Sequence, residues 1–127
     1  MDYHLLENFY TESSSTYTFE NNNSFNSVIE LNSEHGIYKG HFPQVPVAPG
    51  VCLIQTIKEI LMEKFQKKLI LVEGNNIKFL SMINPRETSQ FQIDFIVKQF
   101  DTIIDINANY INSGKIFIKF KGKFKIV

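Results

Sequence analysis

The spacing of apolar residues along the chain predicts one buried helix among several strands. Between residues 51 and 65, apolar side chains recur at helical spacing on more than one face, which predicts a helix that needs burial on several sides. An antiparallel sheet that curls around one long helix would provide that burial, so we expect an α+β fold. Alternating apolar and polar positions predict the strands Thr16–Glu20, Phe25–Asn32, Leu69–Glu73, Asn76–Leu80, Phe91–Phe100, Thr102–Ile111 and Lys115–Ile126.

Two other segments lack a strong periodic pattern. Residues 1–14 predict an N-terminal arm or a short helix, ended by a turn at Ser13–Ser15. Residues 33–50 contain three of the four prolines, which exclude a regular helix or a central strand there. Because no linker or repeat interrupts the pattern, we expect one domain over residues 1–127.

Composition narrows the classes of partner and location. Thirteen basic and thirteen acidic side chains cancel, so we expect neither a nucleic-acid partner nor attachment to a charged membrane surface. No apolar run approaches the roughly 18 residues of a membrane-spanning helix, so no membrane span is expected. Cys52 is the single cysteine and cannot form an internal disulfide, and the first residues lack a signal-peptide pattern. These features favour the cytoplasm.

The segment before and at the start of the helix carries a specific motif. Residues 40–55 have the sequence Gly-His-Phe-Pro-Gln-Val-Pro-Val-Ala-Pro-Gly-Val-Cys-Leu-Ile-Gln. Its spacing resembles the signature of the β-hydroxyacyl-acyl carrier protein dehydratases, in which a Gly-His-Phe-Pro loop continues through Pro-x-x-Pro-Gly into the central helix. The resemblance extends over residues 15–127. It implies the hot-dog fold and the removal of water from 3-hydroxyacyl thioesters in fatty-acid or related polyketide or polyene synthesis.

This chemistry suggests roles for residues of the motif. Elimination of water needs a base for the α-proton, an acid for the departing hydroxyl and stabilisation of the enolate oxygen. His41 is the candidate base, because histidine titrates near neutral pH. Unpaired N–H groups at a helix start favour a partly anionic oxygen, and the resemblance implies that the Gly50 amide polarises the thioester carbonyl. Further substrate contacts are expected from Phe42, Pro49 and Val51.

This chain departs from the family pattern at the position of the expected acid. Fourteen residues after His41 (55 − 41 = 14) the family has Glu or Asp, and this chain has Gln55. An amide can hold a hydroxyl or a water by hydrogen bonds, but it does not exchange a proton near neutral pH. Glu59 lies one helical turn further on the same face and is a candidate substitute acid. Three functions therefore stay open, which are an active dehydratase, a non-catalytic acyl-thioester-binding subunit and a hot-dog thioesterase.

Partners follow from charge and from the resemblance. The last predicted strand would present lysines on one face, which is either a solvated surface or, through Lys121 and Lys123, a docking site for an acidic acyl carrier protein. The resemblance implies a homodimer, or a higher assembly of dimers, with each site built across the dimer interface. No metal-ligand spacing and no phosphate-binding loop is present in the sequence, so no metal or cofactor is expected. The lysines of this strand are Lys115, Lys119, Lys121, Lys123 and Lys125.

Overall fold

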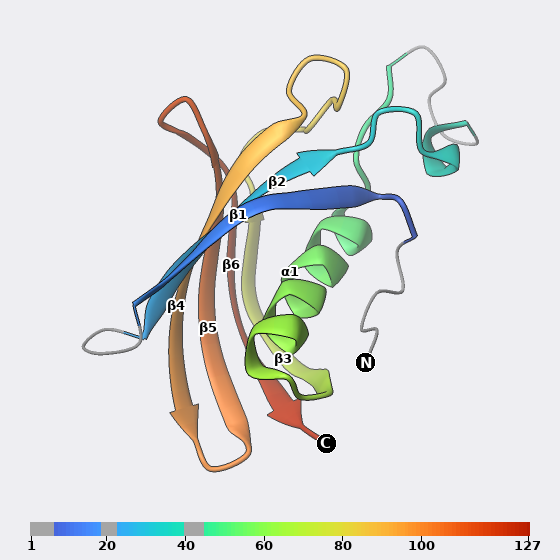
Figure 1. The fold of residues 1–127 in the computed structure, drawn as a ribbon. Coiled ribbons are helices and arrows are strands. Elements are labelled where there is room, and N and C mark those ends of the chain that lie inside the picture. Colours follow the sequence, from blue (N-terminus) through green and yellow to red (C-terminus); the bar gives the residue numbers. More distant parts are fainter. Residues whose placement is uncertain (1–6, 19–22, 40–44) are drawn as a thin grey trace.

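One curved antiparallel sheet wraps around one α-helix in the computed structural model, which describes residues 7–18, 23–39 and 45–127 (Figure 1). The sheet has six strands in the order β1-β2-β4-β5-β6-β3. The predicted α+β hot-dog architecture is confirmed. The elements are β1 (Tyr10–Thr18), β2 (Ser24–Leu31), the short 3-10 helix η1 (Gly36–Tyr38), α1 (Gly50–Phe65), β3 (Leu69–Phe79), β4 (Gln90–Phe100), β5 (Ile103–Asn112) and β6 (Lys115–Ile126).

Helix α1 has the boundaries that its sequence favours. Pro49 precedes it in an extended conformation (φ −65°, ψ 138°), where the missing proline N–H costs nothing. The helix ends at Gln66, which adopts the left-handed conformation (φ 52°), while the Lys67 N–H donates to the Met62 carbonyl at 3.2 Å. None of the described helices is long and apolar enough to span a membrane.

The core lies between α1 and the inner face of the sheet. Along β4, β5 and β6, apolar side chains at alternating positions point inward, as the sequence pattern predicted. These side chains face α1. The largest side chains with almost no exposure are Phe9, Ile29, Ile57, Leu61, Phe91, Ile93, Phe95, Tyr110, Phe120 and Phe124.

Strand β3 is continuous where the sequence predicted two separate strands. Its register with β6 shifts between Leu71 and Glu73 and again between Glu73 and Asn76, so extra residues bulge without ending the pairing. Gly122 of β6 makes this possible, because a Cβ atom at that position would lie 2.6 Å from the Glu73 carbonyl oxygen.

The N-terminal expectation is wrong for residues 10–14. These residues belong to β1 and pair with β2, with one register shift between Glu12 and Ser14, so Ser13–Ser15 is not a turn. The backbone groups of this polar stretch find partners across the ladder, and that tertiary gain overrides the local turn preference of serine. Residues 1–6 lie outside the described part of the chain.

The lysines of β6 do not all share one face. The register with β5 shifts between Tyr110 and Ile111, and Lys115 pairs with Asn112 beyond that shift. One extra residue reverses the alternation of a strand, so Lys115 lies on the opposite side from Lys119, and the predicted set of five is wrong for Lys115. Lys119 to Lys125 at every second position do lie on the outer face, away from α1.

Candidate functional site

The start of α1 lies beside an apolar hollow of about 210 Å³, which we call the helix-start hollow. The segment before the helix is tied to the loop after β3 by a hydrogen bond of 2.8 Å from the Ala48 N–H to the Ile83 carbonyl. The hollow is therefore formed by parts of the chain that are distant in sequence. Its lining residues are Val47, Ala48, Gly50, Leu53, Phe79, Ser81, Met82, Ile83 and Ile118.

The first turn of α1, which includes Gly50 of the hollow lining, has backbone N–H donors without an intrahelical partner. The N-cap residue Pro49 gives no side-chain cap, and its carbonyl accepts from the N–H groups of Cys52 and Leu53 at 3.0 and 3.2 Å. Among the described residues, none accepts from the N–H groups of Gly50 and Val51. These donors lie at the positive end of the helix dipole, where a partly anionic oxygen is stabilised.

Gly50 is in close contact with the Phe79 ring. A Cβ atom on Gly50 would lie 2.8 Å from Cζ of Phe79, so the Phe79 ring covers the helix start from the end of β3. Val51, the next residue, has 77% of its surface exposed. Of the predicted substrate contacts, the structure thus places Pro49, Gly50 and Val51 together, and Phe42 lies outside the described residues.

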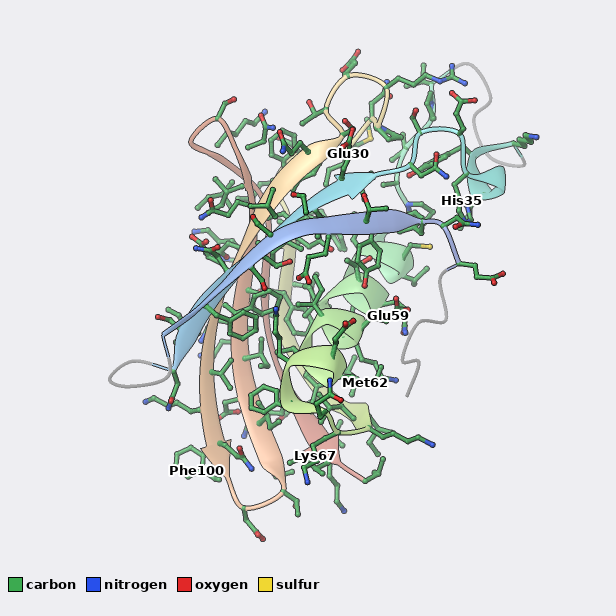
Figure 2. The ribbon with its side chains drawn as sticks, viewed as in Figure 1. Glu30, His35, Glu59, Met62, Lys67 and Phe100 are labelled. Atoms are coloured by element: carbon green, nitrogen blue, oxygen red, sulfur yellow. The ribbon has the colours of Figure 1, made fainter. Side chains whose placement is uncertain are left out.

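One turn along the helix, Gln55 and Glu59 are hydrogen-bonded to each other. Nε2 of Gln55 donates to Oε2 of Glu59 at 3.0 Å. Oε1 of Glu59 accepts from the Tyr10 hydroxyl of β1 at 3.4 Å. Figure 2 shows Glu59 near the middle of α1, and its side chain has no exposed surface, whereas Gln55 is partly exposed.

The burial of Glu59 bears on its predicted role as a substitute acid. Glu59 has no exposed surface, and its carboxylate accepts hydrogen bonds from Gln55 and Tyr10, which disfavours direct contact between Glu59 and a substrate. The same burial disfavours activation of a water by Glu59, which a thioesterase would need. The structure therefore makes Glu59 a partner of Gln55.

The pKa shifts near the site keep its neighbouring groups neutral. Burial raises the pKa of the Tyr10 hydroxyl far above its usual value, and the adjacent Glu59 carboxylate raises it further. Burial also raises the pKa of the Cys52 thiol, with a second contribution from Glu59. Cys52 is thus a buried core thiol, which agrees with the interpretation that it is not a nucleophile.

The remaining predicted site residues lie elsewhere. His41 lies outside the described residues. Lys121 and Lys123 lie on the outer face of the sheet, and Nζ of Lys123 is 3.7 Å from a carboxylate oxygen of Glu73. Within the described ranges, no three His, Cys, Asp or Glu side chains are close enough to hold a metal ion together.

Sequence reasoning missed Tyr10 and Phe79. Tyr10 is separated by 49 residues from the carboxylate that it contacts, and it fell in the segment predicted as an arm or short helix. Phe79 was predicted only as a strand residue. No local signal connects either residue to the motif, because both contacts depend on how the sheet closes around α1.

Exposed apolar side chains form an apolar surface along the edge strand β3 and the loop that follows it. Its exposed side chains lie on both faces of this edge and continue through the loop after the strand to the helix start. Exposed apolar side chains gathered at the edge of a sheet are a common feature of interaction surfaces. Its members are Val51, Ile70, Leu71, Val72, Phe79, Leu80 and Met82, with exposed fractions between 42% and 77%.

Comparison with proteins of known sequence finds dehydratases among the relatives of this chain. The chain is 28% identical over 98 residues to a protein from Lactococcus lactis subsp. cremoris described as 3-hydroxyacyl-[acyl-carrier-protein] dehydratase FabZ, covering 72% of this chain and 66% of that protein. A protein of the same description from Clostridium tetani is 29% identical over 68 residues, covering 48% of each chain. The chain thus spans between about half and two thirds of the length of these curated relatives.

Comparison with solved structures supports the fold. A chain of the dehydratase heterocomplex ApeI:P from Xenorhabdus doucetiae superposes with a TM-score of 0.70 at 14% identity, covering 91% of this chain and 96% of that one. An uncharacterized protein from Erwinia carotovora subsp. atroseptica gives a TM-score of 0.67 at 16% identity, covering 93% of this chain and 95% of that one. A family model described as ApeI dehydratase matches residues 17–121, which is most of the chain. The protein therefore belongs to the ApeI-like family of hot-dog dehydratases.

Proposed function

We propose that the protein removes water from 3-hydroxyacyl thioesters carried on acyl carrier protein. The observation that supports this most directly is that the N–H groups of Gly50 and Val51 have no acceptor among the described residues, with Gly50 in the lining of the helix-start hollow. Donors in this position suit a thioester oxygen that gains negative charge, and the apolar lining suits the acyl chain. The curated relatives are described as acting on acyl-carrier-protein thioesters.

The proposed steps balance without a second acid. His41 takes the α-proton, and the electron pair of the broken C–H bond forms the enolate, whose oxygen accepts from the Gly50 N–H. The hydroxyl oxygen at C3 then takes the proton back from the His41 imidazolium as the C–O bond breaks. Water and an α,β-unsaturated thioester leave, and His41 returns to its neutral form. Gln55 contributes hydrogen bonding in this scheme and no proton.

The site is proposed to be completed by a second copy of the chain. The apolar surface along β3 includes Val51, which lies one helical turn before Gln55 on the same face of α1. A second copy covering β3 would also cover this helix face and enclose the site. Docking of the carrier protein at Lys121 and Lys123 stays a prediction, and the pairing of Lys123 with Glu73 makes Lys121 the freer of the two.

A second candidate is a subunit that binds the thioester without converting it alone. Gln55 in place of a carboxylate favours it, and a protein with the same fold is part of a dehydratase heterocomplex. In that case turnover would need a second hot-dog protein that supplies the acid.

One assay separates the two candidates. Purified protein is incubated with a 3-hydroxyacyl thioester on acyl carrier protein, and the products are followed by mass spectrometry. We expect a mass loss corresponding to water, abolished by His41→Ala and retained in His4→Ala, a histidine outside the motif. Binding without water loss would overturn the dehydratase proposal in favour of the binding subunit. Release of the free carrier thiol would instead indicate a thioesterase.

A further inference from the structure

The Gln55 amide has one orientation in this fold. Its NH₂ group donates to Glu59 Oε2 at 3.0 Å. A primary amide carries its donor and acceptor on opposite sides of the same carbon atom, so Oε1 of Gln55 is directed away from Glu59. Among the described residues, none donates to this oxygen. Gln55 therefore has an unused acceptor while its donor side is occupied.

Glu59 is in turn held in place from β1. Its other carboxylate oxygen accepts from the Tyr10 hydroxyl at 3.4 Å. Tyr10 is almost fully buried, and its hydroxyl keeps its proton at neutral pH, so it acts as a donor towards Glu59 throughout the physiological range. A buried carboxylate that accepts from two sides is fixed more firmly than an exposed one.

Strand β1 is fixed to the helix at a second point. Nζ of Lys64, one turn beyond Glu59 on α1, donates to Oγ of Ser15 at 2.5 Å and lies 3.9 Å from a carboxylate oxygen of Glu12. These contacts hold β1 across the helix on the C-terminal side of Glu59. The position of Tyr10 is therefore set by the strand, and the position of Glu59 by Tyr10.

We propose that Gln55 is the specificity-determining residue that accepts a hydrogen bond from the 3-hydroxyl group of the acyl chain, with Glu59 and Tyr10 as the residues that position it. This rests on the proposed acyl-thioester site. Gln55 is one turn of helix beyond the donors at Gly50 and Val51, and the 3-hydroxyl is two carbons beyond the thioester carbonyl. With its amide in this orientation, Gln55 accepts a hydrogen bond from the ligand through Oε1.

An acceptor at Gln55 would distinguish acyl chains that have the same shape. A 3-hydroxyl group can donate to Gln55, whereas a 3-oxo group can only accept and a saturated chain can do neither. A site whose polar atom is left unpaired by the wrong ligand rejects that ligand. The 3-hydroxyacyl chain is therefore favoured over both others. Loss of Glu59 or Tyr10 would free the amide to turn and would weaken this preference.

Binding measured without turnover tests this. The probes are pantetheine amides of a 3-hydroxyacyl, a 3-oxoacyl and a saturated acyl chain of equal length, because the α-protons of amides are too weakly acidic to be removed during titration. Calorimetry gives the ratio of dissociation constants for each pair. We expect the wild-type protein to bind the 3-hydroxyacyl probe about tenfold more tightly than the saturated one. Gln55→Leu should reduce this ratio to about one, and Glu59→Gln or Tyr10→Phe to about three.

The control is Tyr110→Phe. It makes the same chemical change at another buried tyrosine beside α1, but the Tyr110 hydroxyl donates to the Leu53 carbonyl at 2.5 Å. We expect Tyr110→Phe to keep the wild-type ratio. Partial unfolding of any variant lowers the binding of all probes equally and leaves the ratio unchanged, so the ratio separates positioning from stability.

The possible outcomes also separate the two proposals. If the wild-type protein binds all three probes with equal affinity, the acceptor role of Gln55 is overturned while the acyl site stands. If Glu59→Gln and Tyr10→Phe keep the wild-type ratio while Gln55→Leu loses it, their positioning role is overturned. If no probe binds at millimolar concentration, the acyl site itself fails, and this inference fails with it.

Discussion

Replacing Gln55 by glutamate would place two carboxyl groups in contact on one helix. The new oxygen would occupy the place of Nε2 of Gln55, 3.0 Å from Oε2 of the buried Glu59. At this separation the repulsion of two full charges is about 5 kcal/mol for an effective dielectric constant near 20. This corresponds to about four pH units, so the pair should hold one shared proton up to about pH 8.

The shared proton gives Gln55→Glu a carboxylic acid at position 55, in addition to the His41 imidazolium of the proposed mechanism. General acid catalysis by a positioned group contributes about 10²- to 10⁴-fold, so we expect kcat/KM for dehydration at pH 7 to rise by about that order. The rate should fall again above about pH 8, where the second carboxyl ionises. In the double variant Gln55→Glu with Glu59→Gln, the remaining carboxyl has no like-charged neighbour, and this fall should occur several pH units lower.

The two neighbouring carboxyl groups of Gln55→Glu also make the unfolding free energy of this variant depend on pH. The pKa of one carboxyl is raised in the folded protein above its unfolded value of about 4.3, so the folded state binds the extra proton. The unfolding free energy of Gln55→Glu should therefore decrease as the pH rises from about 4 to about 8, by up to about 5 kcal/mol relative to the wild-type protein. The double variant should lack this decrease.

Two measurements decide the outcome, namely pH profiles of kcat/KM and denaturant unfolding from pH 5 to pH 9 for the wild-type protein and both variants. If the pH at which the kcat/KM of Gln55→Glu falls were the same in the double variant, the coupling to Glu59 would be refuted. If Gln55→Glu gained no activity although its pKa was raised, the missing carboxylate at this position would not be what limits dehydration.

Three other substitutions test the structure more widely. Gly122→Ala should lower the unfolding free energy by about 1–3 kcal/mol, because its Cβ atom would lie 2.6 Å from a backbone oxygen of β3; Gly36→Ala, with no atom within 4 Å, is the control, and equal losses would contradict the argument. Tyr38→Phe should leave stability unchanged or raise it by up to about 1 kcal/mol in denaturant unfolding, because the described residues offer no partner to the buried Tyr38 hydroxyl. Burial raises the pKa of Tyr38 to about 12, so the unfolded chain loses this proton first, and alkaline titration should show wild-type stability decreasing from about pH 10 to about pH 12 more steeply than in Tyr38→Phe. Leu71→Lys on the edge strand should convert a dimer to a monomer in analytical ultracentrifugation, whereas Ile96→Lys, similarly exposed but inside the sheet, should not.

The fold was predictable because its strongest signals are local. The helix beginning at Gly50 has apolar residues on several faces and a proline just before it, and both features act within a few residues. The strands of residues 90–126 alternate with period two, and a turn at Asn112–Gly114 joins the last pair, with Ser113 and Gly114 at positive φ. These elements appear at nearly their predicted positions.

Predictions that rested on weak local preference were less successful. The serines at 13–15 favour turns in isolation, yet they lie in β1 because β2 offers a complete set of backbone partners. The two predicted strands between Leu69 and Leu80 are one strand, since the pairing of β3 with β6 tolerates bulges. Lys115 changes face because of a single extra residue in β6. Register depends on the neighbouring strand, and it is not encoded within either strand alone.

The same distinction between local and tertiary signals applies to the candidate site. By itself, the sequence determined the motif spacing, the glycine at the helix start and the departure at Gln55, because each depends on residue identity at a fixed separation. Only the tertiary structure decided that Phe79 covers Gly50 and that Tyr10 reaches Glu59 across 49 residues. These contacts form when the sheet closes around α1, and their geometry depends on packing between elements that local propensity does not describe.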